Sequence, residues 1–112
     1  MTHQNNLKVI VFVGEDAEKA VDYLTEKHFP KVVAPDITSQ VEHLVRAGQH
    51  RIVTSAISDV ESYKNLAHEF PGELYLVTVG NAPDDLARLT HHHVSSEPKI
   101  IDELLEELDF KL

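Results

Sequence analysis

Apolar residues along the chain gather in short runs that are separated by longer amphipathic stretches. Four of these runs are continuous and rich in β-branched residues, covering residues 7–13 (LKVIVFV), 31–34 (KVVA), 51–55 (RIVTS) and 73–79 (ELYLVTV). A run without polar alternation is typical of a β-strand that is covered on both faces. The pattern therefore predicts four buried strands.

The stretches between and after these runs carry apolar residues at helical spacing. The first stretch places Ala17, Ala20, Val21 and Leu24 on one face, and the last places Ile101, Leu104, Leu105, Leu108 and Leu112 on another. Ser39 with Glu42, and Ser58 with Glu61, fit the capping-box pattern and predict the starts of two further helices. Pro83, followed by two aspartates, predicts a helix after the last strand. Strands and helices thus alternate, and an amphipathic helix ends the chain.

This alternation predicts crossover connections, and hence a parallel sheet with helices on both faces. We expect one α/β domain over residues 1–112, a three-layer sandwich with a four-stranded parallel sheet and a C-terminal amphipathic helix. With the strands numbered along the chain, the order 2-3-1-4 is favoured over 2-1-3-4. Ligands of such folds bind beyond the carboxyl ends of the strands. The loops expected there are 13–16, 34–39, 54–59 and 79–83.

Composition narrows the possible functions. The chain has 10 basic and 19 acidic residues, a net charge of −9 with histidine neutral, and no cysteine. A negative field repels the phosphate backbone, so nucleic acid is not expected as a partner. The absence of cysteine removes disulfides and thiolate metal sites, and it suits the cytoplasm. No apolar run approaches the length that a bilayer requires, so we predict a soluble, cytoplasmic protein without membrane association.

Several polar residues and histidines are candidates for a binding site. The loops at the expected ligand edge contain Asp36, Thr38, Ser39, Ser55, Ser58 and Asp59. Each is a common helix-capping residue, and together they could hydrogen-bond a small polar ligand. His91, His92 and His93 follow the predicted fourth helix, where imidazoles interact favourably with the helix dipole. Because consecutive helical residues point in different directions, no metal site is expected.

The turn after the first strand, GEDAEKA (14–20), has a partial likeness to the phosphate-binding loop G-x-x-x-x-G-K-[ST]. That loop uses glycines so that backbone N–H groups converge on a phosphate, a lysine for the outer phosphates and a hydroxyl for magnesium. Gly14 and Lys19 are present, but the second glycine is missing and Ala20 stands in the hydroxyl position. The residues alone predict an ordinary strand-to-helix turn.

Acidic residues in the first helical turn strengthen that prediction. Glu15, Asp16 and Glu18 stand where a phosphate would lie. A carboxylate about 5 Å from a phosphate charge costs roughly 3 kcal/mol at an effective dielectric constant near 20. The positive end of this helix dipole therefore already interacts with the helix's own carboxylates, and a polyphosphate gains little binding energy there.

Residues 7–89 nevertheless resemble P-loop nucleotide kinases of the dephospho-coenzyme A kinase and adenylate kinase type. The opening, from VIVFVG to KAVDYLTEKHFPKVVAPD, matches their pattern at Leu24, Glu26, Phe29, Val32, Val33 and Asp36. The stretch from RIVTS to DDLARL is similar to the part that precedes their lid, where Arg88 matches a lid-side arginine. The resemblance implies a nucleotide site with Gly14, Lys19, Asp36 and Arg88 as its cofactor-binding residues.

The chain departs from these kinases at positions that serve catalysis. The third predicted strand ends in Thr54 and Ser55 where a magnesium-binding acid is expected, and THHHVSS follows Arg88 in place of an arginine-bearing lid. Phosphoryl transfer depends on positioning and charge neutralisation. No catalytic residue is therefore assigned, and at most weak binding of ATP with Mg²⁺ is expected.

Three functions follow from these observations. The leading hypothesis is a non-catalytic binding or regulatory domain that resembles a shortened, degenerate P-loop kinase and binds a nucleotide or a small polar ligand. One alternative is an active nucleotide or nucleoside phosphate kinase with an atypical loop. The other is an interaction module that uses the acidic C-terminal helix to form a homodimer or to bind another protein.

Overall fold

The structure, a computed structural model, describes residues 7–90 and 92–111. Its elements are β1 (Lys8–Val13), α1 (Ala17–Glu26), α2 (Ile37–Arg46), β2 (Arg51–Thr54), α3 (Val60–Glu69), β3 (Leu74–Val79), α4 (Asp84–Ala87), β4 (His92–Val94) and α5 (Pro98–Glu107). None of these helices, within the residues described, is long and apolar enough to cross a membrane.

The strands form one all-parallel sheet in the order β2-β1-β3-β4. β1 is central and pairs with β2 on one side and with β3 on the other, while β4 extends the sheet beyond β3. Residues Val9 to Val13 of β1 are at most 3 % exposed, because both faces of this strand are covered. The prediction of an α/β fold with a four-stranded parallel sheet is thus confirmed.

The strand predicted at residues 31–34 does not form. Its trace in the sheet is one isolated parallel bridge between Lys31 and Val53. The Gln40 side chain hydrogen-bonds both backbone groups of Val33. It accepts from the Val33 N–H (3.2 Å) and donates to the Val33 carbonyl oxygen (2.5 Å). A side chain thereby replaces a strand partner, and the chain turns from the sheet into α2.

The fourth strand is β4, in a segment predicted to follow a helix and to interact with its dipole. His92 and His93 pair with Val77 and Thr78 of β3. His93 Nδ1 also lies 2.5 Å from Thr78 Oγ1. The interpretation of the histidines as dipole partners was therefore wrong for His92 and His93, whereas His91 lies outside the described residues. The sequence HHV has no apolar run, so the hydrophobic pattern gave no sign of this short edge strand.

The predicted strand order was also wrong, because it counted residues 31–34 and omitted β4. Numbered along the chain, the observed strands lie in the order 2-1-3-4. The neighbours of the central strand are nevertheless the segments 51–55 and 73–79, as the favoured order required.

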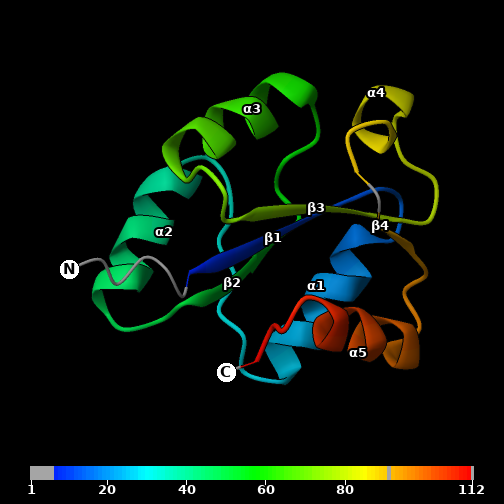
Figure 1. Ribbon diagram of the computed structural model, residues 1–112, viewed down its shortest axis with the longest axis horizontal. Coiled ribbons are helices and arrows are strands. Elements are labelled where there is room, and N and C mark those ends of the chain that lie inside the picture. Colours follow the sequence, from blue (N-terminus) through cyan, green and yellow to red (C-terminus); the bar gives the residue numbers. More distant parts are fainter. Residues whose placement is uncertain (1–6, 91, 112) are drawn as a thin grey trace.

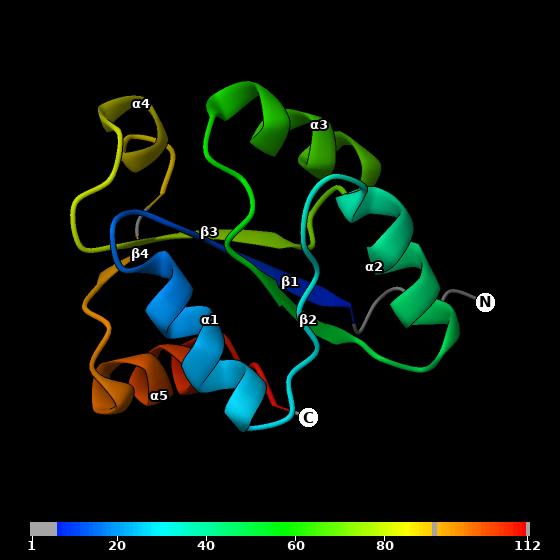
Figure 2. The ribbon, with the colours of Figure 1, turned by 180° about the vertical axis from the view of Figure 1, so that it is seen from behind.

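Helices cover both faces of the sheet, as Figures 1 and 2 show from opposite sides. α1 and α5 lie on one face, while α2, α3 and α4 lie on the other. Alternate residues of β1 serve the two faces. Ile10 and Phe12 belong to the core under α1 and α5, whereas Val9, Val11 and Val13 belong to the core under the other three helices.

α2 and α3 begin at aspartates instead of the predicted serines. Asp36 is the N-cap residue of α2 and Asp59 that of α3, so the capping boxes assigned to Ser39 and Ser58 were wrong. The Asp59 carboxylate accepts a hydrogen bond from the Ser62 N–H at 2.7 Å. This bond lowers the pKa of the Asp59 carboxyl below its ordinary value, because it favours the ionised form.

The apolar face of α5 packs against the rest of the domain. Ile101, Leu104 and Leu105 are at most 8 % exposed and pack into the core that contains α1. At its edge the Tyr23 hydroxyl donates to Asp102 Oδ1 at 2.8 Å, which ties α1 to α5. The face that a helix-mediated partner would need is therefore already covered.

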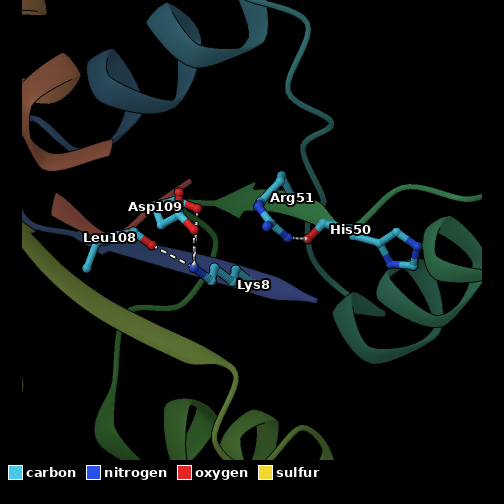
Figure 3. Close-up of polar contacts among 5 residues, drawn as sticks. All are labelled: Lys8, His50, Arg51, Leu108 and Asp109. Atoms are coloured by element: carbon cyan, nitrogen blue, oxygen red, sulfur yellow. Dashed lines mark hydrogen bonds and ion pairs between the residues drawn. The ribbon is translucent and has the colours of Figure 1, made fainter. Parts of the chain in front are cut away.

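The segment after α5 is fixed to the amino-terminal edge of the sheet. Lys8 Nζ donates hydrogen bonds to the carbonyl oxygens of Leu108 (2.8 Å) and Asp109 (3.2 Å), as Figure 3 shows. Because these carbonyls end the helix, a cation beside them is also favoured by the helix dipole. Phe110 stacks on Phe29 with 5.1 Å between ring centroids. The two ends of the described chain thus stabilise one another.

Candidate functional site

A cavity of about 350 Å³ lies at the carboxyl ends of β1, β2 and β3. It is lined by Val13, Gly14, Glu15, Ala17, Ser55, Ile57, Ser58, Asn81, Ala82, Pro83 and Leu86. These residues come from the loops after the three strands and from the starts of α1 and α4. In open parallel sheets this edge is where ligands bind.

The direction of the helices explains why a hollow forms here. β1 leads into α1 on one face of the sheet, whereas β2 and β3 lead into α3 and α4 on the other face (Figures 1 and 2). Neighbouring loops that leave a sheet toward opposite faces open a crevice between them. The cavity therefore follows from the topology of the chain.

The loop after β1 is hydrogen-bonded to the loop after β3. The Glu15 N–H donates to the Asn81 carbonyl oxygen (2.8 Å), and the Asp16 N–H donates to the Val79 carbonyl oxygen (3.2 Å). In return, the Asn81 N–H donates to Glu15 Oε2 at 3.2 Å. We call these three bonds the loop clasp. A phosphate-binding loop needs backbone N–H groups that point toward its ligand, and the clasp directs two of them at carbonyl oxygens.

Gly14 is required by this arrangement. Its φ of +123° is rarely adopted by residues with a side chain. A Cβ atom added there would lie 2.4 Å from the carbonyl oxygen of Val79 and 3.0 Å from that of Asn81. The glycine thus allows two backbone segments to approach closely, and this packing accounts for it without a phosphate.

Lys19, the predicted phosphate-binding lysine, lies outside the cavity lining. Its Nζ is 3.5 Å from Asp16 Oδ1 and its side chain is 72 % exposed. An ion pair this exposed adds little to stability. It nevertheless places a carboxylate beside the cation that an outer phosphate would need.

The other predicted cofactor-binding residues are also elsewhere. Asp36, at the start of α2, borders two smaller hollows beside α2. Arg88 is exposed at the end of α4 and is absent from the lining of the cavity. Of the four residues that the kinase resemblance implied, the cavity includes Gly14 alone.

Thr54, at the end of β2, has a structural role. It is fully buried, and its hydroxyl donates to the Val32 carbonyl oxygen (2.8 Å) and accepts from the Ala56 N–H (3.1 Å). In P-loop kinases the resemblance places a magnesium-binding acid near this position. Here a threonine instead fixes the path of two chain segments.

The interior of the cavity is mostly apolar. Ile57 and Leu86 are almost fully buried and belong to the core under α2, α3 and α4. The polar side chains in the lining are those of Glu15, Ser55, Ser58 and Asn81. The sequence placed the right loops at this edge but did not single out Ile57, Asn81 or Leu86. Position within loops 54–59 and 79–83 was the available signal for the first two.

Metal binding finds no support in the described residues. Among them, no group of three or more histidine, aspartate or glutamate side chains is arranged to hold an ion. His92 and His93 lie on β4, next to a small hollow that also includes Glu103 and Glu107.

Comparison of the chain with protein-family models, curated proteins and solved structures found no match. No relative therefore assigns a role to any residue of the cavity. The resemblance to P-loop kinases stays a prediction.

Proposed function

We propose that the protein is a small, non-catalytic binding domain, and that it resembles a shortened P-loop nucleotide kinase whose phosphate loop has become a structural joint. Its ligand site is the cavity at the carboxyl edge of the sheet. The absence of cysteine suits a reducing compartment, and we propose that the protein acts in the cytoplasm.

The loop clasp is the observation that carries this proposal. The Glu15 and Asp16 N–H groups donate to carbonyl oxygens, so binding a polyphosphate would first have to break both bonds. The carbonyl oxygens of Asn81 and Val79 would then lose these partners, and Val79 is buried, where an unsatisfied group costs about 1–3 kcal/mol. The carboxylates of Glu15 and Asp16 add repulsion to that cost.

An active kinase is less well supported by the same geometry. Lys19 is exposed and beside Asp16, Ala20 offers no hydroxyl, and Thr54 is occupied with main-chain groups. Transfer of a phosphoryl group needs its charge neutralised and its atoms held in line. The cavity lining supplies no cation for either task among the residues described.

Titration with ATP and Mg²⁺ tests the proposal, with the amide signals of Gly14 to Val21 as readout. We expect no saturable shift of these signals at millimolar nucleotide. Saturable shifts below roughly 1 mM would instead favour a nucleotide-binding enzyme. Lys19→Met is the matched variant. If the proposal holds, neither chain responds to ATP, whereas at a working phosphate site the variant would bind ATP more weakly than the unchanged chain.

A further inference from the structure

The charge around the cavity restricts what it can bind. Glu15 is the ionisable residue in the lining, and no lysine, arginine or histidine is among the described residues that form it. The same three loops and helix starts also carry Asp16, Glu18, Asp59, Asp84 and Asp85. Lys19 faces Asp16. The edge therefore has a negative potential, in keeping with the net charge of −9.

The apolar part of the lining adds a second restriction. Ala82 and Pro83 present accessible carbon atoms beside the buried Ile57 and Leu86, and polar side chains are few. A cavity with an apolar body and a small number of polar groups is the usual composition of a small-molecule site. At about 350 Å³ its volume is near the lower end of the range for such sites.

Glu15 is positioned by hydrogen bonds to Asn81. Its Oε2 accepts the Asn81 N–H, and its own N–H donates to the Asn81 carbonyl oxygen. A carboxylate has two oxygens with about four acceptor positions. Glu15 is exposed, and the bond to Asn81 orients one oxygen of its carboxylate while leaving acceptor capacity for a ligand.

We propose that the cavity binds a small organic cation, namely a protonated primary amine on a compact apolar body. The ammonium group donates to the Glu15 carboxylate and to the hydroxyls of Ser55 and Ser58, and the apolar body packs against Ala82 and Pro83. This inference rests on the proposed function, since it takes the cavity to be the ligand site. An anion of the same size meets carboxylates and no compensating cation, and a neutral analogue loses the ionic part of the attraction.

Three probes of similar size separate these cases: phenethylamine, 2-phenylethanol and phenylacetate. Each is titrated into the full chain while the amide signals of Gly14, Ser55 and Asn81 are followed. We expect saturable shifts with the amine, roughly fivefold weaker binding of the alcohol, and the weakest binding of the acid.

Two variants tie the response to the cavity. Glu15→Gln keeps an acceptor for the Asn81 N–H and should reduce amine affinity to that of the alcohol. Ser58→Tyr places a bulky side chain at an exposed position of the lining and should abolish the shifts. Ser95→Tyr, at an exposed position away from the cavity, is the matched control and should bind as the unchanged chain does.

Equal affinity for the amine and the acid overturns the inference, as does the absence of saturable shifts with the amine up to roughly 10 mM. Unchanged amine binding by Glu15→Gln overturns the role of the carboxylate. A parallel titration with ATP and Mg²⁺ keeps the two proposals apart. A response to ATP contradicts the proposed function, whereas failure of the amine alone leaves the loop clasp standing.

Discussion

Glu15 and Asn81 bind each other reciprocally: the Glu15 N–H donates to the Asn81 carbonyl oxygen, and the Asn81 N–H donates to the Glu15 carboxylate. Sixty-six residues apart in the chain, they join the loops that follow two neighbouring strands. The pair uses the backbone that a phosphate-binding loop would offer to a nucleotide. It also fixes the one carboxylate of the cavity lining.

Gly14→Ala should strongly destabilise the fold. The new Cβ would meet the Val79 carbonyl oxygen at 2.4 Å, and the positive φ adds backbone strain. We expect a loss of about 3 kcal/mol or more in the free energy of unfolding. Urea denaturation measures it. Gly48→Ala is the control, because Gly48 also has a positive φ but has nothing within 4 Å of an added Cβ. Its loss should be roughly 1 kcal/mol, and equal losses would contradict the close approach at Gly14.

Glu15→Ala should weaken the loop clasp, because it removes the acceptor of the Asn81 N–H. We expect the free energy of unfolding to fall by about 1 kcal/mol and the Asn81 amide hydrogen to exchange faster. Glu15→Gln retains an acceptor oxygen and should preserve most of the protection. Identical exchange of Asn81 in both variants and in the unchanged chain would show that the side chain does not hold this loop.

Asp59→Asn should change how stability depends on pH. The Ser62 N–H lowers the pKa of the folded Asp59 carboxyl, so this group stabilises the fold above its unfolded pKa of about 3.9. That contribution is lost as pH falls through the lower, folded pKa. Asparagine also caps helices but does not titrate there. The stability difference between the two chains should therefore be constant near about pH 6 and shrink near about pH 3. Urea midpoints at both values would show this, and a difference that does not vary with pH would refute the capping bond.

Ile101→Ala should destabilise the domain without changing its assembly state. Ile101 is fully buried in the core under α1 and α5, so truncation should cost about 2–5 kcal/mol. Ile100, its partly buried neighbour, provides the control and should lose less stability on truncation to alanine. Denaturation and size-exclusion chromatography are measured together. A shift from dimer to monomer with little loss of stability would revive the idea that α5 serves a partner.

The central part of the fold could be predicted from the sequence because burial leaves a plain signal. In the segments 7–13, 51–55 and 73–79, apolar residues are buried on both faces, which is what a strand between two helical layers requires. Residues 31–34 carry a similar signal but have their backbone diverted by Gln40. β4 is an edge strand of three residues held by pairing with β3, and its polar sequence resembles a loop.

For the candidate site, the sequence predicts only which loops surround it, because residue type does not reveal backbone contacts or where a side chain lies. Gly14 is identifiable because a strand-to-helix turn favours glycine, and it does line the cavity. Asn81 contributes through backbone groups, which any residue other than proline would also provide. Lys19 and Arg88 are implied as site residues by the kinase resemblance alone. Their chemical type does not reveal that one faces Asp16 and that the other lies outside the lining.

Amide hydrogen exchange at Glu15 and Asp16, with and without ATP and Mg²⁺, tests the loop clasp most directly. We predict that both N–H groups are protected in the free protein and that nucleotide leaves their exchange rates unchanged, because their acceptors are the Asn81 and Val79 carbonyl oxygens. Rapid exchange in the free protein, together with protection that appears only when nucleotide is added, would show that these groups await a phosphate and would contradict the clasp.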